Sequence, residues 1–423
     1  MRLKLLLSII LCSLFLFYKY VTQLYPSLIS VDLIHNYFLS GVQVSILASS
    51  YYYSYSTMQI FAGFIIDKFD VKIPVFLSII TIALSVFIFS HTKNYFMMCL
   101  LRVFMGMGCA FATVIYVKCS ACWASPKIFV IITSFLATAA MIGATLGSTP
   151  VANLFEHVGW HHGLEYISFI GLMLAFVCLY FLSNKSSPYN TNGKTKITKA
   201  DFLVTILNKN NWVLMIYAGA TFAPVIILGG LWGTPFLMKK YAIEVVQSSY
   251  LLSTMFIGLG LGAPFWAFIS TKLNFKKELM HANNAVSFVM LFFIVYLNFS
   301  YYLTLTCFFT LGFTVSIFML SFDLCRIFNS VHVIGIAAAF MNSGEGLVTS
   351  IIEPFIGKIL DIRKGIHPDY SVLDFQIAFL LIFFCFIISS VAISFLKIIE
   401  NSEEIKLDLE TSIHSGLNKS LGI

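Results

Sequence analysis

The spacing of apolar stretches along the chain constrains its fold more than any other feature. A helix needs about 20 mostly apolar residues to cross the hydrocarbon core of a bilayer. The sequence holds twelve such stretches, near 5–30, 42–66, 73–91, 94–118, 127–152, 163–183, 211–237, 247–270, 281–299, 302–326, 333–360 and 374–398. They predict an all-α integral membrane protein with 12 transmembrane helices.

The longest polar interruption divides these stretches six and six. It reads NKSSPYNTNGKTKITKADF and is rich in lysine. We therefore expect four regions in the chain, an N-terminal six-helix bundle over 1–184, a cytoplasmic linker over 185–210, a C-terminal six-helix bundle over 211–400 and a cytoplasmic tail over 401–423.

The composition indicates which surroundings and partners suit such a chain. Of the 423 residues, 59% are hydrophobic and 11% are charged, whereas a soluble protein carries about a quarter charged residues. The excess apolar surface is expected to face the lipid bilayer. The basic residues form no stripe interleaved with aromatic residues, which argues against nucleic acid as a partner.

The sequence predicts neither a metal nor a cofactor. Its nine cysteines lie mostly within apolar stretches, where cysteine acts as a small buried apolar residue. Cys119 and Cys122 form a C-x-x-C motif, but no second pair or nearby histidine completes a zinc site. The sequence lacks a G-x-x-x-x-G-K-[ST] loop, so nothing points to ATP as the energy source.

Lysine and arginine are unevenly distributed between the two sides that twelve spans define. With the N-terminus inside, 18 of the 26 basic residues fall in cytoplasmic segments and 6 in outer ones, while Lys19 and Arg102 lie within spans. The positive-inside rule then places both termini in the cytoplasm. We interpret the first apolar stretch as a retained span because no small-residue cleavage site follows it. The short termini favour a multi-pass protein of a cell inner membrane.

An internal repeat supports the division into two halves. The segment after the second apolar stretch reads GFIIDKFDVKIPVF, and the segment after the eighth reads AFISTKLNFKKELM. Both place a basic cluster in a short loop at the same position of each half. Two similar halves related by an axis along the membrane normal are typical of secondary transporters.

The first of these loops resembles the signature G-x-x-x-D-[RK]-x-G-[RK]-[RK] of the major facilitator superfamily. Gly63, Asp67, Lys68 and Lys72 match it, while Asp70 replaces the second glycine. We expect a conformational latch at the four matching residues. Gly63 permits close helix packing, and Asp67 at a helix end can pair with basic residues or with the N-terminus of a facing helix. Alternatively, Lys68 and Lys72 are only topology signals.

A second signature of the superfamily, R-x-x-x-G-x-G in the fourth span, is present as Arg102, Gly106 and Gly108. The resemblance covers nearly the whole chain and implies a major facilitator fold. The segments YYYSYSTMQIFAGFIIDKF and LGSTPVANLFEHVGWHH resemble a branch with amino-acid and nucleoside permeases of intracellular bacteria and lysosomal dipeptide exporters. The drug-antiporter signature G-P-x-x-G-G is broken, since Ser148 follows Gly147.

Polar residues form stripes on three predicted helices. At about 100° per residue, the members of each stripe share one face of their helix. A lysine at the centre of a membrane-spanning helix costs about 2.5–3.5 kcal/mol. Such charges are therefore expected to face a water-filled cavity and to pair with one another. The stripes are Lys19, Gln23, Pro26 and Ser30 on the first helix, Tyr52, Tyr55, Ser56 and Gln59 on the second, and Asn342, Glu345, Thr349 and Glu353 on the eleventh.

The stripes predict a site for a small-molecule substrate with charges of both signs. Lys19 offers an ammonium group to a carboxylate, and Glu345 offers a carboxylate to an ammonium group. An ion pair between Lys19 and Glu345 is the alternative, and Trp232 either gates the cavity or anchors at the outer interface. The residues assigned to substrate binding are Lys19, Gln23, Tyr52, Tyr55, Gln59, Trp232, Asn342 and Glu345.

Proton coupling is assigned to Arg102, Glu345 and Glu353. A carboxyl group inside the membrane can carry a proton. Arg102 cannot lose its proton, so it would hold an anion or influence a nearby acid. A structural ion pair is the alternative for Arg102.

The sequence favours a secondary active transporter that moves an amino acid or short peptide by alternating access, as a proton symporter and a monomer. An organic-anion or nucleoside permease and a drug or metabolite efflux antiporter remain alternatives. An enzyme is less favoured because every histidine lies in or near a loop.

Overall fold

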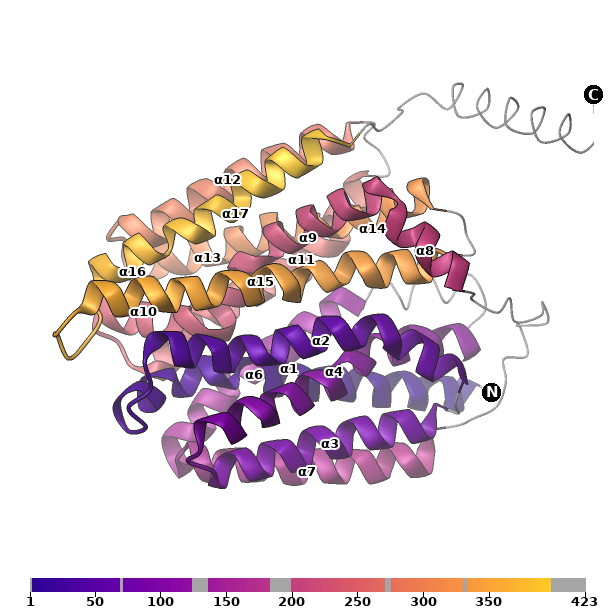
Figure 1. Cartoon of the computed structure of the whole chain (residues 1–423), viewed down its shortest axis with the longest axis horizontal. Helices are drawn as coiled ribbons and strands as arrows, with labels where there is room; N and C mark the ends of the chain where they lie inside the picture. The colour runs from indigo at the N-terminus through magenta and orange to yellow at the C-terminus, as the bar shows by residue number, and fades with distance from the viewer. Residues whose placement is uncertain are drawn as a thin grey trace, which may run out of the picture.

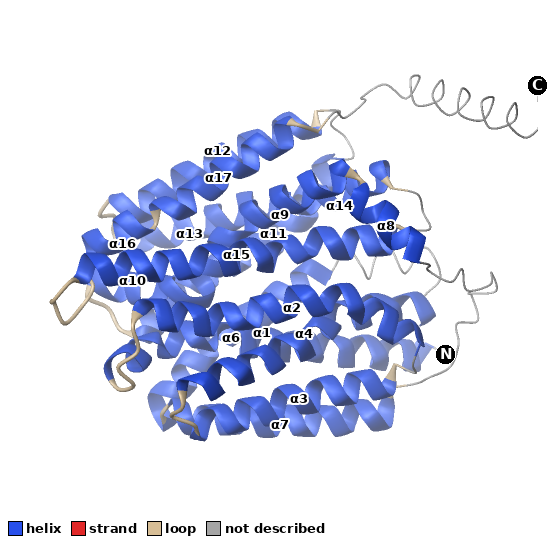
Figure 2. Ribbon diagram, viewed as in Figure 1, coloured by secondary structure: helices blue, strands red, loops and turns tan. Residues whose placement is uncertain are grey.

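The computed structural model describes residues 2–68, 71–123, 136–182, 199–270, 275–329 and 333–396. Within these ranges the chain is helical, with short turns and no strand (Figure 2). The predicted tail, residues 401–423, and most of the predicted linker lie outside the described residues. The all-α fold class is confirmed.

The helices of the first half follow the predicted apolar stretches. Where the structure describes the connections they are short turns, and helices that are neighbours in the sequence run in opposite directions. The helices are α1 (Arg2–His35), α2 (Gly41–Lys68), α3 (Lys72–His91), α4 (Tyr95–Trp123), α6 (Leu136–Val158) and α7 (Trp160–Phe181).

The second half repeats this plan, but three of its spans are interrupted. A short helix, α8 (Lys199–Leu207), occupies part of the segment predicted as a linker. The spans are α9 (Lys209–Ile227) with the π-helical turn η1 (Leu228–Trp232) and α10 (Gly233–Tyr241), α11 (Val245–Ser270), α12 (Lys276–Tyr296), α13 (Tyr301–Val315) with the 3-10 turn η2 (Ser316–Met319) and α14 (Leu320–Phe328), α15 (Ile334–Lys364), and α16 (Val372–Ala378) with α17 (Leu380–Ser394).

Nine helical stretches of the described chain are long and apolar enough to cross a membrane. The helices α2, α6 and α15 have 28, 23 and 31 residues and are long enough too, but they are more polar. Their position explains this polarity. In the contact between the two halves, α2 packs on α15 and α6 packs on α11. Helices that face the other half need less apolar surface than helices that face lipid.

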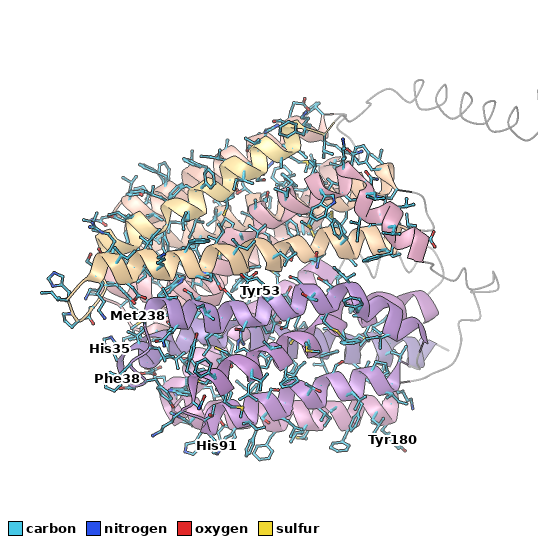
Figure 3. All side chains as sticks on the ribbon, in the orientation of Figure 1. His35, Phe38, Tyr53, His91, Tyr180 and Met238 are labelled. Atoms are coloured by element: carbon cyan, nitrogen blue, oxygen red, sulfur yellow. The ribbon has the colours of Figure 1, made fainter. Side chains whose placement is uncertain are left out.

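The long axes of the helices define two ends of the molecule (Figure 1). At one end, called the terminal end, α1 begins and α8 lies. At the other end, called the far end, lie the turn 36–40 and the segment 365–371. Figure 3 places His35, Phe38 and His91 at the far end and Tyr180 at the terminal end.

The two glycines of the fourth-span signature have a packing role. A Cβ on Gly106 would collide with the backbone carbonyl of Tyr51 on α2, and one on Gly108 would lie 2.8 Å from the Ser78 carbonyl on α3. Because neither glycine has a side chain, α4 can pack closely against both α2 and α3. A Cβ on Gly63, in contrast, would meet no described atom within 4 Å. The expectation that Gly63 serves close packing is not supported.

Candidate functional site

Lys19 lies in the middle of α1 and points into the protein, with 5% of its surface exposed. Its Nζ donates a hydrogen bond to the Tyr55 hydroxyl at 3.2 Å. The same Nζ lies 4.4 Å from the ring centroid of Tyr20 and 4.6 Å from that of Tyr55. Ammonium groups over aromatic faces are stabilised by the ring quadrupole. The aromatic contacts hold this charge inside the helix bundle, and the side chain does not reach toward a helix end.

Glu345 on α15 faces this group from the other half. It lies within electrostatic range of Lys19, Tyr20 and Tyr55, and its side chain is partly exposed. No ion pair within 4.0 Å joins Lys19 to Glu345, both of which the structure describes. We call this group the lysine layer, comprising Lys19, Tyr20, Tyr55, Gln59 and Glu345.

Gln59 completes the lysine layer on α2. Its Nε2 donates to the Tyr55 hydroxyl at 3.4 Å, while its Oε1 is buried with no hydrogen-bond partner among the described residues. The lysine layer therefore contains one buried hydrogen-bond acceptor without a donor among the described residues.

Arg102 on α4 is fully buried and has fixed partners. One guanidinium nitrogen donates to the Thr22 carbonyl at 2.8 Å and another to the Gln23 carbonyl at 3.5 Å. The Thr22 carbonyl is free because residue 26, its usual partner four positions on, is a proline without an N–H group. The charge of Arg102 therefore satisfies a carbonyl that Pro26 leaves without a donor.

Two tyrosine rings enclose the same guanidinium. Its Cζ lies 4.7 Å from the ring centroid of Tyr51 and 5.2 Å from that of Tyr25. Arginine is suited to such stacking because its guanidinium is planar and weakly hydrated.

Glu353 on α15 is fully buried and connects the two halves. Its Oε2 accepts a hydrogen bond from Ser49 Oγ on α2 at 3.1 Å. Its Oε1 has no hydrogen-bond partner among the described residues, although Arg102 and Tyr52 lie within electrostatic range. We call this second group the arginine layer, comprising Ser49, Tyr51, Tyr52, Arg102 and Glu353.

The remaining predicted substrate residues belong to neither layer. Gln23 is buried beside Tyr52, and Asn342 is partly buried on α15. Trp232 is fully buried in η1 and packs edge-on against Tyr370, with ring centroids 6.2 Å apart. This burial argues against the interface-anchor interpretation of Trp232.

The predicted latch is largely untested. The side chains of Asp67 and Lys68 lie outside the described residues, and Lys72 is partly buried at the start of α3. The latch stays a prediction.

Sequence reasoning missed two residues of the arginine layer. Ser49 lies three residues before Tyr52 and shares its helical face, so extending the stripe by one turn would have included it. Tyr51 lies outside the predicted stripe of α2, although its ring covers Arg102. Of the three consecutive tyrosines, Tyr53 alone is largely exposed, at 45%.

Comparisons with known proteins identify a family from a family model and a fold from solved structures. A family model described as Major Facilitator Superfamily matches residues 7–352. The chain is 25% identical over 183 residues to an uncharacterized protein of Campylobacter jejuni, a match that covers 43% of this chain and 54% of that relative.

Solved structures of transporters are similar over nearly the full length. A bacterial homolog of the human lysosomal transporter Spinster, in an inward-facing and unoccupied conformation, gives a TM-score of 0.76 at 13% identity and covers 92% of this chain and 96% of its own. The nucleoside transporter NupG gives 0.73 at 14% identity, covering 92% and 99%. At these identities the likeness shows the fold alone.

Proposed function

Because the chain belongs to the major facilitator superfamily, a family of membrane transporters, we propose that it moves a small zwitterion, an amino acid or short peptide, together with a proton. The two halves would rock around the lysine layer, exposing it to each side of the membrane in turn. Both termini would lie on the cytoplasmic side of a cell inner membrane, and the protein would work as a monomer.

The observation that carries this proposal is the relation between Lys19 and Glu345. They bear opposite charges and come from opposite halves. They lie within electrostatic range of each other without forming an ion pair. A zwitterion would bridge them, with its carboxylate on Lys19 and its ammonium group on Glu345. Binding would then connect the two halves, and a ligand can shift a conformational equilibrium only by binding one state better.

The neutral groups of the lysine layer support a polar substrate of modest size. Tyr55 holds the Lys19 amine, and the buried Oε1 of Gln59 lacks a partner. A buried acceptor without a donor costs about 1–3 kcal/mol. An N–H or O–H group of the substrate would remove that cost.

For the proton we favour Glu353. Its carboxyl lies at the contact between α2 and α15, where one oxygen accepts from Ser49 and the other has no described partner. Protonation would turn that second oxygen into a donor and would remove a negative charge from the interface between the halves. Arg102 would stay charged throughout, because its guanidinium does not lose its proton.

An organic-anion permease is less favoured. Such a protein would use both Lys19 and Arg102 to bind the anion. The guanidinium of Arg102 instead donates to the Thr22 carbonyl and lies against two tyrosine rings, and only its Nε lacks a partner among the described residues. Lys19 is then the cation that faces Glu345.

The test is uptake into proteoliposomes with an imposed proton gradient, using a labelled panel of amino acids, dipeptides and nucleosides. We expect accumulation of a zwitterionic class by the wild type, lost in Lys19→Ala and in Glu345→Gln. Lys209→Ala is a matched control, since this lysine lies at the start of α9, outside both layers. Accumulation that survives both site variants would contradict the proposed site, and uptake of nucleosides alone would contradict the proposed substrate.

A further inference from the structure

The far end of α2 begins with a local capping arrangement. The first amide groups of any helix lack acceptors within the helix. Here Gln43 donates its backbone N–H to Ser40 Oγ at 3.2 Å, and Ser40 donates its N–H to Gln43 Oε1 at 2.8 Å. This reciprocal cap satisfies the amide of Gln43 and leaves those of Gly41 and Val42 without a local acceptor.

An aspartate from the other half accepts both remaining amides. Gly41 donates its N–H to Asp361 Oδ1 at 2.7 Å, and Val42 donates its N–H to Oδ2 at 2.9 Å. Asp361 lies near the C-terminal end of α15. A carboxylate at a helix N-terminus is favoured both by the hydrogen bonds and by the helix dipole.

A third donor fixes the same carboxylate. The Tyr370 hydroxyl donates to Asp361 Oδ1 at 2.7 Å. Burial and the neighbouring carboxylate raise the pKa of Tyr370 above its ordinary value, so the phenol keeps the proton that it donates. Tyr370 also packs on Trp232, which connects the contact to the aromatic residues beneath it.

The contact is too close for a side chain on Gly41. A Cβ there would lie 2.7 Å from the Tyr370 hydroxyl, 2.9 Å from Asp361 Oδ1 and 3.0 Å from the Gly357 carbonyl. Real Cβ atoms essentially never approach within 3.0 Å. The two halves therefore meet here backbone against backbone.

Other described contacts between the halves toward the far end are weaker, because they join neutral or exposed groups. Ser27 and Thr234 share a hydrogen bond of 2.8 Å between neutral hydroxyls, and Ser148 donates to the Ser249 carbonyl at 3.3 Å. The contact of His35 with Asp369, at 3.4 Å, is about half exposed, and exposed polar pairs contribute little. Hydrogen bonds to a charged group are about twice as strong as neutral ones.

We propose that Asp361 is the lock that holds the far end of the molecule closed, and that transport requires its release from the N-terminus of α2. This role rests on the proposed transport function, since only a protein that opens in turn to each side needs such a release. Opening would separate α15 from α2 and turn the amides of Gly41 and Val42 toward water.

The test measures opening at a distance from Asp361. A single cysteine replaces Ser249, which is buried on α11 against α6, in a protein whose native cysteines are substituted. Its rate of reaction with a maleimide is followed in nanodiscs. Asp361→Asn removes the charge, Gly41→Ala separates the backbones, and Tyr370→Phe removes one donor. Glu244→Gln is the control, because Glu244 is an exposed acid at the far end, just before α11.

We expect the reaction rate to rise about tenfold or more in Asp361→Asn and Gly41→Ala, which corresponds to a shift of about 1.4 kcal/mol. A smaller rise is expected in Tyr370→Phe, and none in Glu244→Gln. Wild-type rates in both Asp361→Asn and Gly41→Ala would overturn the proposal, because a purely local cap would leave Ser249 closed. The assay needs no substrate, so an error in the proposed cargo or proton would leave its outcome unchanged.

Discussion

The lysine layer and the arginine layer each bring a base of the first half near an acid of α15, but they hold these charges differently. Arg102 is fixed by backbone carbonyls and two rings, and Glu353 is fixed by Ser49. Lys19 has one hydroxyl and two ring faces, and Glu345 remains partly exposed. The difference teaches that a fully buried charge bonded across helices stabilises the fold, whereas a partly exposed charge such as Glu345 is suited to a ligand.

Removal of Arg102 should have the largest effect on stability. Arg102→Met leaves Glu353 without its nearby positive charge and the Thr22 carbonyl without a donor. Removing one partner of a buried charged pair in this way lowers the free energy of unfolding by about 3–5 kcal/mol. We expect thermal unfolding of the purified protein at a clearly lower temperature than the wild type.

Lys19→Met is the matched control for that measurement. It removes a buried base whose opposite charge is not in contact, so its effect on unfolding should be within about 1 kcal/mol. Equal destabilisation by the two variants would remove the distinction between the layers.

The two acids should separate in transport assays. Glu353→Gln cannot give up a proton, so gradient-driven accumulation should fall at least about tenfold, while exchange of substrate at equal pH persists. Glu345→Gln loses part of the substrate site, so it should impair both. Loss of exchange in Glu353→Gln would place this residue in the substrate site instead.

The hydroxyl of Tyr55 should contribute modestly to the lysine layer. Tyr55→Phe removes the hydrogen bond that positions the Lys19 amine, a net loss of about 0.5–1.5 kcal/mol. We expect KM to rise about three- to tenfold with little change in the unfolding temperature. Tyr51→Phe is the control, because Tyr51 covers Arg102 with its ring and the Lys19 amine donates to Tyr55 instead.

The smallest effect is expected from Pro26→Ala. An alanine restores the N–H group that the Thr22 carbonyl lacks, so Arg102 gives up one acceptor. Stability should change by less than about 1 kcal/mol. The informative result is the double variant with Arg102→Met, which should be less destabilised than the sum of the single variants. Strict additivity would show that Arg102 does not depend on the carbonyl freed by proline.

The sequence predicted the helices well because the length of an apolar stretch reports a membrane span directly. The interruptions at η1 and η2 were not expected, since hydropathy does not distinguish π and 3-10 turns from α-helix. The polar stripes identified Lys19, Tyr55, Gln59 and Glu345 as candidate site residues, because residues on one helical face recur at a known period.

The sequence could not show which helix faces which. Whether Lys19 pairs with Glu345 or stays apart depends on how two distant helices pack. The contact of Asp361 with the start of α2 was missed for the same reason. It spans 320 residues, and Asp361 reads in the sequence as one more acid near a helix end.

The proposed closure of the far end would also determine how a membrane potential acts on the protein. With α2 held against α15, and α6 against α11, most of the voltage would fall across the closed region. With both acids ionised, the two layers together carry no net charge, and a proton on Glu353 adds one. Each elementary charge moved through the full potential is worth about 2.3 kcal/mol per 100 mV. The reorientation of the protein loaded with substrate and proton would therefore depend on the membrane voltage. The return of the empty protein would not depend on it.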